Sequence, residues 1–339
     1  MVKESRLFPL GLELTSMERR WIPRTLTAFS RKTMAWRLGR LLRARRIDVA
    51  LAEYATFATD VIHGCALAGV PLVVHFHGFD IYMNEVLQEN KTSYQHLFRH
   101  AGGFIVGARD MQAHAISLGV PEARLHYNPC GVDGSRFAPV QAGSNPPRII
   151  SIGRFVDKKA PYLTLLAFKM AKEKCPEAQL VMAGEGAVLE ACRQIARACH
   201  LIESVRFVGR QTHQEVAALL RTGRAFAQHS LRTTQGDSEG TAISILEASA
   251  TALPVIATSH AGIKDTMVHG ETALLCSEGD IDTMARHMVA LLTDPDLATR
   301  MGSAGRTRVI EHFSMEKSIQ GIYRILETVY GAPSAMPTQ

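Results

Sequence analysis

The sequence predicts an α/β protein made of two Rossmann-like, doubly wound domains that face a cleft. Its 339 residues are many for a single hydrophobic core and sufficient for two. Short apolar runs alternate with segments of helical periodicity along most of the chain, which is typical of parallel sheets covered by helices. A loop rich in Gly, Ser, Asn and Pro at residues 141–147 divides this alternation into two series of strands and helices. We therefore place the domain boundary at residue 147.

The N-terminal domain, residues 1–147, shows about four strands. Apolar runs at 47–52, 72–76 and 104–106 predict strands, and the segments 60–68 and 110–118 predict helices.

The C-terminal domain, residues 148–313, reads as a complete doubly wound unit. One helix after its first strand is indicated by Leu163, Leu166, Ala167 and Met170, which recur at helical spacing. A last helix over 314–331 is predicted to pack back toward the N-terminal domain. The strands of the C-terminal domain are predicted at 148–152, 179–183, 205–208, 225–228, 254–258 and 273–276.

Positive charge is concentrated in residues 1–46, which hold twelve Lys or Arg against three acids. Interleaved apolar residues such as Trp21 and Trp36 predict an amphipathic basic helix. Such a helix either lies on anionic lipid or forms an ordinary surface helix with a solvated basic face, and both interpretations stay open. We expect no nucleic-acid partner, because no recognised binding motif accompanies the charge.

Neither a membrane-spanning apolar run nor a signal-peptide core is present in the sequence. A cytoplasmic location is therefore expected, peripheral on the inner face of the plasma membrane if residues 1–46 bind lipid. The six cysteines are scattered without a C-x-x-C pair, so they predict neither a zinc site nor a disulfide framework. We expect no metal.

Unusual residues of the C-terminal domain cluster after its strands. Because the carboxyl ends of parallel strands meet at one edge of a sheet, these loops converge on a common ligand site. Arg154 and Lys159 supply a planar guanidinium and a mobile ammonium, the pair that suits a diphosphate. The residues predicted for this edge after the first two strands are Gly153, Arg154, Lys159, Gly184 and Glu185.

Two acids, Glu239 and Glu247, stand eight residues apart, and Gly240, Thr241 and Ala242 are predicted to begin a helix between them. On one helix the two carboxylates are about 12 Å apart along the axis, too far for a glycosidase acid/base pair. The spacing instead suits one acid that binds sugar hydroxyls and another that binds a ribose, with the diphosphate at the helix N-terminus.

The segment Glu239–Glu247 resembles the E-x7-E motif of the large retaining glycosyltransferase family 4. Gly153–Lys159 is similar to the family's G-R-L-V-x-x-K phosphate loop, and the resemblance spans roughly Val70 to the C-terminus. Within the family, the surroundings of Glu239 look like the branch that builds bacterial exopolysaccharides of the colanic acid and amylovoran type. Further matching segments follow in family order at 183–186, 205–209, 253–256 and 270–275.

This resemblance implies a GT-B fold and a metal-independent, retaining hexosyltransferase without a cofactor. The donor would be a UDP- or GDP-sugar and the acceptor a glycan or a lipid-linked glycan. Arg154 and Lys159 would stabilise the leaving diphosphate, Glu239 would hold the sugar hydroxyls and Glu247 the ribose. The other residues that the resemblance assigns to donor binding are Gly153, Gly184, Glu185, Gly240, Thr241 and Ala242.

In the N-terminal domain, the segment 75–80 resembles the family's H-G-x-D segment, in which the histidine matched by His77 faces the donor sugar. The competing interpretation of His77 is a satisfied polar residue at a strand end.

Two departures from the family pattern are visible. Ala160 stands where the family has Gly, and residues 1–46 lack the usual opening strand and Gly-rich loop, which predicts a shortened N-terminal, acceptor-side domain. The alternative function is therefore a catalytically impaired protein that still binds nucleotide sugars. A nicotinamide-dependent enzyme is disfavoured because no G-x-G-x-x-G follows a first strand.

Overall fold

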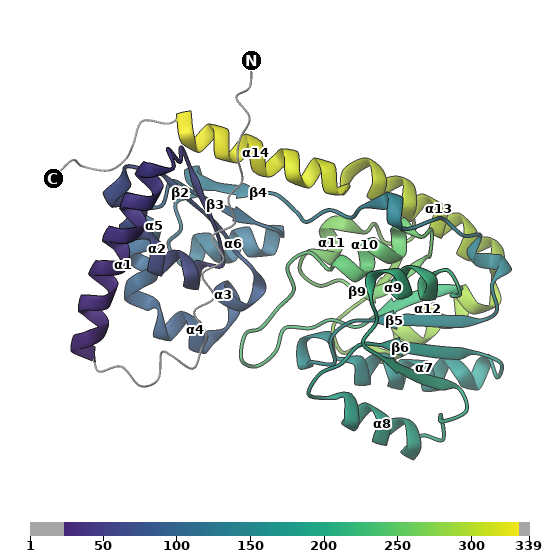
Figure 1. Cartoon of the computed structure of the whole chain (residues 1–339). Helices are drawn as coiled ribbons and strands as arrows, with labels where there is room; N and C mark the ends of the chain where they lie inside the picture. Colours follow the sequence, from purple (N-terminus) through teal and green to yellow (C-terminus); the bar gives the residue numbers. More distant parts are fainter. Residues whose placement is uncertain (1–23, 332–339) are drawn as a thin grey trace.

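Two parallel β-sheets, each covered by helices, organise residues 24–331, the part of the chain that the computed structural model describes (Figure 1). Every strand pairing in both sheets is parallel. The prediction of two parallel α/β domains is therefore confirmed.

The N-terminal sheet has four strands in the order β1-β2-β3-β4. The predicted strands are present, but the helix expected over 60–68 already begins at Ala55. Three short helices between the second and third strands were not predicted. The elements of this domain are α1 (Arg24–Ala44), β1 (Ala50–Glu53), α2 (Ala55–Ala68), β2 (Leu72–His75), α3 (Gly78–Tyr82), α4 (Asn84–Glu89), α5 (Lys91–His100), β3 (Gly103–Val106), α6 (Arg109–Ser117) and β4 (Leu125–Tyr127).

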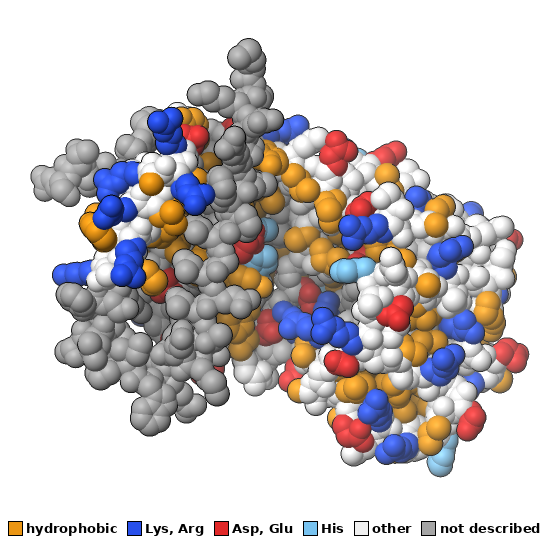
Figure 2. All heavy atoms as spheres, in the orientation of Figure 1, with side chains coloured by type: hydrophobic (Ala, Val, Ile, Leu, Met, Phe, Trp, Pro, Cys, Tyr) orange, Lys and Arg blue, Asp and Glu red, His pale blue; other side chains and the backbone are white. Residues whose placement is uncertain are grey.

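Helix α1 forms within the basic N-terminal region and packs on α2. Ala35 and Leu42 are buried, and Gly64 of α2 lets the helices approach, since a Cβ there would lie 2.7 Å from the Leu38 side chain. Over residues 32–44 of α1, basic side chains are exposed among apolar ones (Figure 2). Ala35 and Leu42 of this helix thus pack on their own domain. Residues 1–23 of the basic region lie outside the described residues.

The C-terminal sheet has six strands in the order β10-β9-β8-β5-β6-β7. Strand β5 pairs with β6 on one side and β8 on the other, so the direction of winding reverses between β5 and β8. The elements are β5 (Arg148–Ile152), α7 (Pro161–Lys174), β6 (Gln179–Ala183), α8 (Leu189–Ala198), β7 (Val205–Gly209), α9 (His213–Leu220), β8 (Ala225–Gln228), α10 (Ile243–Ala250), β9 (Val255–Thr258), α11 (Ile263–Thr266), β10 (Ala273–Cys276), α12 (Ile281–Thr293) and α13 (Pro295–His312).

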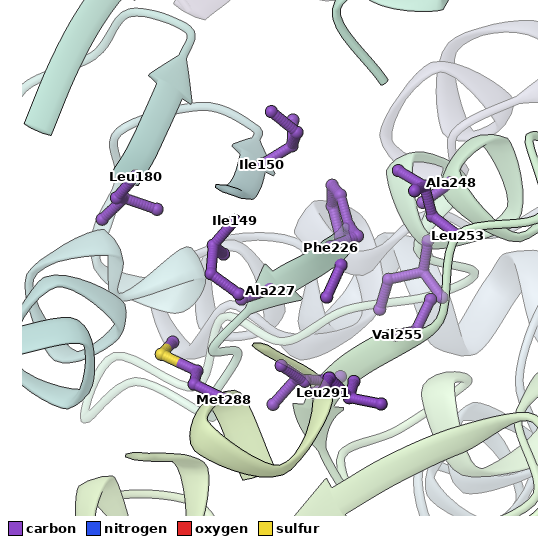
Figure 3. Close-up of a cluster of buried hydrophobic side chains, with 14 of the residues drawn as sticks. Ile149, Ile150, Leu180, Phe226, Ala227, Ala248, Leu253, Val255, Met288 and Leu291 are labelled. Atoms are coloured by element: carbon purple, nitrogen blue, oxygen red, sulfur yellow. The ribbon is translucent and has the colours of Figure 1, made fainter. Parts of the chain in front are cut away.

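The core of this domain lies between the sheet and its covering helices. Figure 3 shows side chains of β5, β8 and β9 gathered with those of α10 and α12, among them Phe226, Ala248 and Met288. Val132, Phe137 and Ala142 are buried in the same core although they precede residue 147. The boundary at residue 147 stays a prediction.

A single long helix, α14 (Met315–Gly331), returns from the C-terminal domain and lies along the N-terminal domain (Figure 1). Its Ile325 and Val329 form a small buried cluster with Val73 and Ile105 of the N-terminal sheet. Gly103 makes room for this contact, because a Cβ at that position would come within 2.9 Å of Val329. The helix therefore ties the two domains together.

No helix between Arg24 and Gly331 combines the length and apolar character needed to cross a bilayer. All six cysteines fall in the described range and are free thiols, four of them buried. No disulfide joins any two of them.

Candidate functional site

The loops after β5 and β6 are joined at the carboxyl edge of the C-terminal sheet, next to the point where the winding reverses. The Gly153 N–H donates to the Ala183 carbonyl at 3.0 Å, and the Phe155 N–H donates to the Glu185 carbonyl at 2.8 Å. Gly184 has φ 134°, and a Cβ there would lie 1.9 Å from the Gly153 carbonyl oxygen. Only glycine fits at this position, which explains its place in the sequence pattern.

Lys159 and Glu239 meet at this edge. Their Nζ and Oε2 atoms are 3.2 Å apart, and the side chains are only 13% and 8% exposed. Burial opposes the ionised form of Glu239, but the ammonium groups of Lys159 and Lys158 hold the pKa of this carboxyl below its ordinary value. The second oxygen, Oε1, is buried without a hydrogen-bond partner. The site therefore holds a charged carboxylate with one unused acceptor.

Lys158 was not among the predicted site residues, yet it is more buried than Lys159. Its Nζ donates to Asp237 Oδ1 at 3.0 Å and to the Ser238 carbonyl at 3.2 Å. In the sequence Lys158 is marked only by its position next to Lys159, and the family motif matches Lys159 alone. The two lysines thus contact two successive parts of the segment that leads into α10.

Ala160, which replaces the glycine expected from the family pattern, has φ 35° and ψ 52°. This is the left-handed region, where a side chain carries a steric cost of about 1–2 kcal/mol. The backbone at this position therefore keeps a conformation suited to glycine although the residue is alanine.

His260 contacts the backbone of Glu239. Its Nε2 lies 3.3 Å from the Glu239 backbone N–H and 3.0 Å from Ser238 Oγ, and its Nδ1 lies 2.6 Å from Glu278 Oε1. Because a backbone N–H can only donate, we assign Nε2 as the acceptor and the ring proton to Nδ1, which donates to Glu278. Glu278, which follows β10, was not predicted from sequence, since nothing in its local pattern distinguishes it from a surface acid.

The helix after Glu239 begins later than predicted. Helix α10 starts at Ile243, so Gly240, Thr241 and Ala242 precede it, and the expected 12 Å separation along one helix axis does not apply. The reason is a contact with the N-terminal domain. Thr241 Oγ1 donates to the Gly107 carbonyl at 2.9 Å and accepts from the Cys130 N–H at 3.1 Å, which holds this segment out of the helix.

The segment that carries Glu239 lies against the N-terminal domain along much of its length. A Cβ on Gly78 would approach the Ser238 carbonyl oxygen to 2.4 Å, so only glycine permits this contact. The Asn84 N–H donates to the Gln235 carbonyl at 2.9 Å. The Lys159–Glu239 pair is therefore close to where the two domains meet.

On the N-terminal side, His77 lies beyond the end of β2. Its Nε2 is 2.6 Å from Glu53 Oε2, and its ring packs on Tyr54 with centroids 4.3 Å apart. Asp80 anchors this loop, since its buried carboxylate accepts from the backbone N–H groups of His77 and Ala55. Burial outweighs these hydrogen bonds and raises the pKa of Asp80 to about 6. The imidazole is thus hydrogen-bonded, as its competing interpretation expects, and remains a third exposed.

The remaining predicted residues are only partly brought together. Arg154 is exposed and lines a small cavity with Gly153, Lys159 and Gln228. Glu185 is exposed. Glu247 is half-buried on α10, and burial raises its pKa, opposed by His213. Within residues 32–331 no hydrogen bond or ion pair links Arg154, Glu185 or Glu247 to the Lys159–Glu239 pair. Their roles stay predictions.

Known proteins resemble the chain in sequence. A putative colanic acid biosynthesis glycosyltransferase, WcaL of Escherichia coli, is 29% identical over 284 residues, which cover 82% of this chain and 70% of WcaL. The amylovoran biosynthesis glycosyltransferase AmsK of Erwinia amylovora is 28% identical over 260 residues, 75% of this chain and 63% of AmsK. The predicted likeness to the colanic acid and amylovoran branch is confirmed.

Solved structures share the fold. The crystal structure of Anabaena Alr3699/HepE in complex with UDP superposes with a TM-score of 0.77 at 17% identity, covering 87% of this chain and 82% of HepE. The two parallel-sheet domains therefore have the GT-B fold.

Family matches cover both domains. Residues 6–136 match Glycosyltransferase Family 4, so the resemblance begins earlier than the Val70 expected from sequence. Residues 135–308, more than half of the chain, match Glycosyl transferases group 1. This chain belongs to the glycosyl transferases group 1 family.

Proposed function

We propose that this protein transfers a sugar from a UDP- or GDP-sugar to a glycan or lipid-linked acceptor in exopolysaccharide biosynthesis. The names of WcaL and AmsK support the polysaccharide class, and the UDP complex of HepE supports a nucleotide ligand for a protein of this fold. The alternative of a protein that only binds nucleotide sugars is an outcome of the test below.

The observation that carries this proposal is the buried Lys159–Glu239 pair with one unpartnered carboxylate oxygen. A buried hydrogen-bond acceptor without a donor costs about 1–3 kcal/mol of folding free energy, so it marks a position where a ligand hydroxyl could donate a hydrogen bond. A sugar hydroxyl donating to Glu239 Oε1 would satisfy it. Lys159, in the same contact, would supply positive charge close to the departing diphosphate.

The chemistry proposed is retaining transfer without a metal or an enzyme nucleophile. The bond between the anomeric carbon and the diphosphate oxygen breaks, a bond to the acceptor oxygen forms on the same face, and the acceptor proton passes to the diphosphate. Arg154 and Lys159 stabilise the charge that develops on the leaving group, which is the kind of electrostatic contribution that usually dominates enzymatic rate enhancement. His77 lines the sugar side and Glu247 holds the ribose.

We further propose that transfer takes place at the cytoplasmic face of a membrane, where a lipid-linked acceptor is available. Exposed basic residues on α1, among them Arg37, Arg40 and Arg43, fit an anionic surface. Trp36 is 52% exposed beside them, with the Arg40 guanidinium 4.7 Å from its ring centre.

The test is release of UDP or GDP from a panel of nucleotide sugars, with and without lipid-linked acceptor. We expect acceptor-dependent release from one donor, and a loss of about 100-fold or more in the rate for Glu239→Gln, the scale of removing one electrostatic contact to a transition state. Glu203→Gln, an exposed acid in a loop before β7, is the matched control. Saturable donor binding without turnover on any acceptor would instead establish the binding-only alternative.

A further inference from the structure

Helix α6 of the N-terminal domain begins without a capping side chain of its own. The first N–H groups of a helix have no partner within the helix, and the N-cap residue here is Ala108, which has no side-chain acceptor. The cap comes from the C-terminal domain instead, since Asp265 Oδ2 of α11 accepts from the Arg109 backbone N–H at 2.8 Å. The two helices face each other across the boundary between the domains (Figure 1).

Charge favours this contact. A carboxylate at a helix N-terminus interacts favourably with the helix dipole. Beside it, the Lys264 ammonium lies 2.9 Å from Asp110 in the first turn of α6, but these two side chains are 43% and 46% exposed. An ion pair that is so open to water contributes little. The contact of Asp265 with the backbone is therefore the stronger link between the two helices.

Helix α11 is also fixed to its own domain. Arg308 of α13 donates to the Thr266 carbonyl at 2.6 Å and to the Asp265 carbonyl at 3.3 Å. The cap thus joins two helices that are each packed in a different domain, and it sets how one domain lies against the other at this point.

The segment that follows Glu239 is packed between α6 and α11. A Cβ on Gly262, the residue before α11, would lie 2.4 Å from the Gly240 carbonyl oxygen and 3.4 Å from the Ala108 Cβ. Glycine is therefore required where these three segments meet. A shift of α11 relative to α6 would act directly on the segment between them.

Glu239 is held from both sides of this junction. His260, two residues before Gly262, accepts from the Glu239 backbone N–H. Thr241, two residues after Glu239, donates to the carbonyl of Gly107, which stands just before α6. The position of Glu239 therefore depends on how α11 and α6 lie relative to each other.

We propose that Asp265 is a positioning residue, which caps α6 across the domain boundary and thereby fixes the segment that carries Glu239. It acts through Glu239 and not on a reacting atom. Its consequence for turnover rests on the proposed transferase function, whereas its effect on the geometry of the segment does not.

The experiment is hydrogen exchange at single backbone amides of the full-length protein without ligand, in Asp265→Ala and Asp265→Asn. In Asp265→Ala the Arg109 amide loses its acceptor and the Glu239 amide loses its fixed surroundings. We expect both amides to exchange about ten-fold faster or more, the effect of losing one hydrogen bond. Asparagine keeps a carbonyl oxygen that can accept, so Asp265→Asn should restore most of the protection. Thermal unfolding checks that both variants are folded.

Two further variants serve as controls. Asp282→Ala removes an exposed acid from the first turn of α12, and Lys264→Met breaks only the exposed ion pair. Both should leave the exchange of the Arg109 and Glu239 amides as in the parent protein. Unchanged exchange at Arg109 in Asp265→Ala overturns the proposed cap. Faster exchange at Arg109 with unchanged exchange at Glu239 overturns the positioning role.

Steady-state kinetics test the consequence for transfer. We expect kcat to fall about ten-fold in Asp265→Ala with little change in the KM for the donor, because a misplaced Glu239 loses an interaction made in the transition state. Asp265→Asn should recover most of kcat. An equal fall of kcat in Asp265→Ala and Lys264→Met would contradict a specific role of Asp265. A parent protein without turnover contradicts the proposed function alone, because the exchange measurements use neither donor nor acceptor.

Discussion

At the scale of single residues, the site depends on how Glu239 is held. Its carboxylate is fixed by Lys159, and its backbone N–H donates to His260, whose other nitrogen is hydrogen-bonded to Glu278. Each member of this chain decides the state of the next, because the proton on His260 Nδ1 is what leaves Nε2 free to accept. A residue far from any substrate contact can therefore position the acid.

The first prediction concerns this positioning role of Glu278. Glu278→Ala removes the acceptor that keeps the His260 proton on Nδ1, so we expect kcat to fall roughly ten-fold, the effect of losing one hydrogen bond in the transition state. Glu278→Gln keeps a carbonyl oxygen and should retain most of the rate. Steady-state kinetics with saturating donor measure both variants. Equal rates for alanine and glutamine would contradict a positioning role through His260.

The second prediction concerns the pH dependence of stability through His229, which follows β8. Burial lowers the pKa of His229 to about 4, opposed by Glu278, whereas an unfolded histidine titrates near 6.5. Between pH 4 and pH 6.5, His229 is protonated in the unfolded chain but neutral in the folded one. The free energy of unfolding therefore falls as the pH drops from about 6.5 to 4. In His229→Gln this part of the fall should disappear.

Urea unfolding at a series of pH values measures the effect of His229→Gln. His312→Gln, at an exposed position near the end of α13, should leave the pH profile as it is in the parent protein. A pH profile that keeps the same slope in His229→Gln would show that another group is responsible.

Asp80 acts in the opposite sense, because burial raises its pKa to about 6. Its contribution makes the protein less stable as the pH rises from about 4 to 6.

At the scale of elements, the site is built from loops held by backbone geometry. The loops after β5 and β6 interlock through Gly184, and the segment before α10 stays outside the helix because Thr241 donates a hydrogen bond to the Gly107 carbonyl. Glycines are required where two main chains touch, and a side chain there moves both loops.

The third prediction compares two glycines with positive φ. Gly184→Ala places a methyl group against the Gly153 carbonyl and should destabilise the fold by roughly 3 kcal/mol, besides weakening donor binding. Gly209→Ala is the control, since φ is +71° there but no atom lies within 4 Å of the added Cβ. Its cost should be only about 1 kcal/mol. Chemical denaturation of both variants decides, and equal costs would contradict the steric argument.

At the scale of the whole molecule, α14 determines how the domains are joined. It leaves the C-terminal domain and buries Ile325 and Val329 against the strands of the N-terminal sheet. Asn128, between the domains, donates to the Ser318 carbonyl on the same helix at 3.1 Å. Since the candidate site uses both domains, the helix that connects them is part of what keeps the site in place.

The fourth prediction is that Val329→Asp destabilises the N-terminal domain by roughly 3 kcal/mol, because it buries a charge without a partner. Both tryptophans, Trp21 and Trp36, belong to the N-terminal part of the sequence, so tryptophan fluorescence during urea unfolding reports on this domain. Tyr330→Asp, at a neighbouring position that is 59% exposed, should change the midpoint little. Equal midpoints for the two variants would show that α14 does not stabilise this domain.

Much of the fold followed from local pattern. The predicted bounds of β5, β6, β8 and β10 agree with the structure, because a buried parallel strand is a short apolar run that needs no distant residue to be recognised. Gly153, Ala183 and Gln228, which lie at or just after the ends of β5, β6 and β8, line one small cavity, since parallel strands end at a common edge.

What the sequence by itself determined is thus the set of strands, the edge at which they present polar residues and the family to which the chain belongs. Only the tertiary structure decided where α10 begins and which lysine contacts which acid. It also decided that Glu278 contacts His260 and that Glu53 contacts His77. The physical reason is that these features depend on contacts between segments far apart in the chain, such as Thr241 with Gly107, and no local periodicity encodes them.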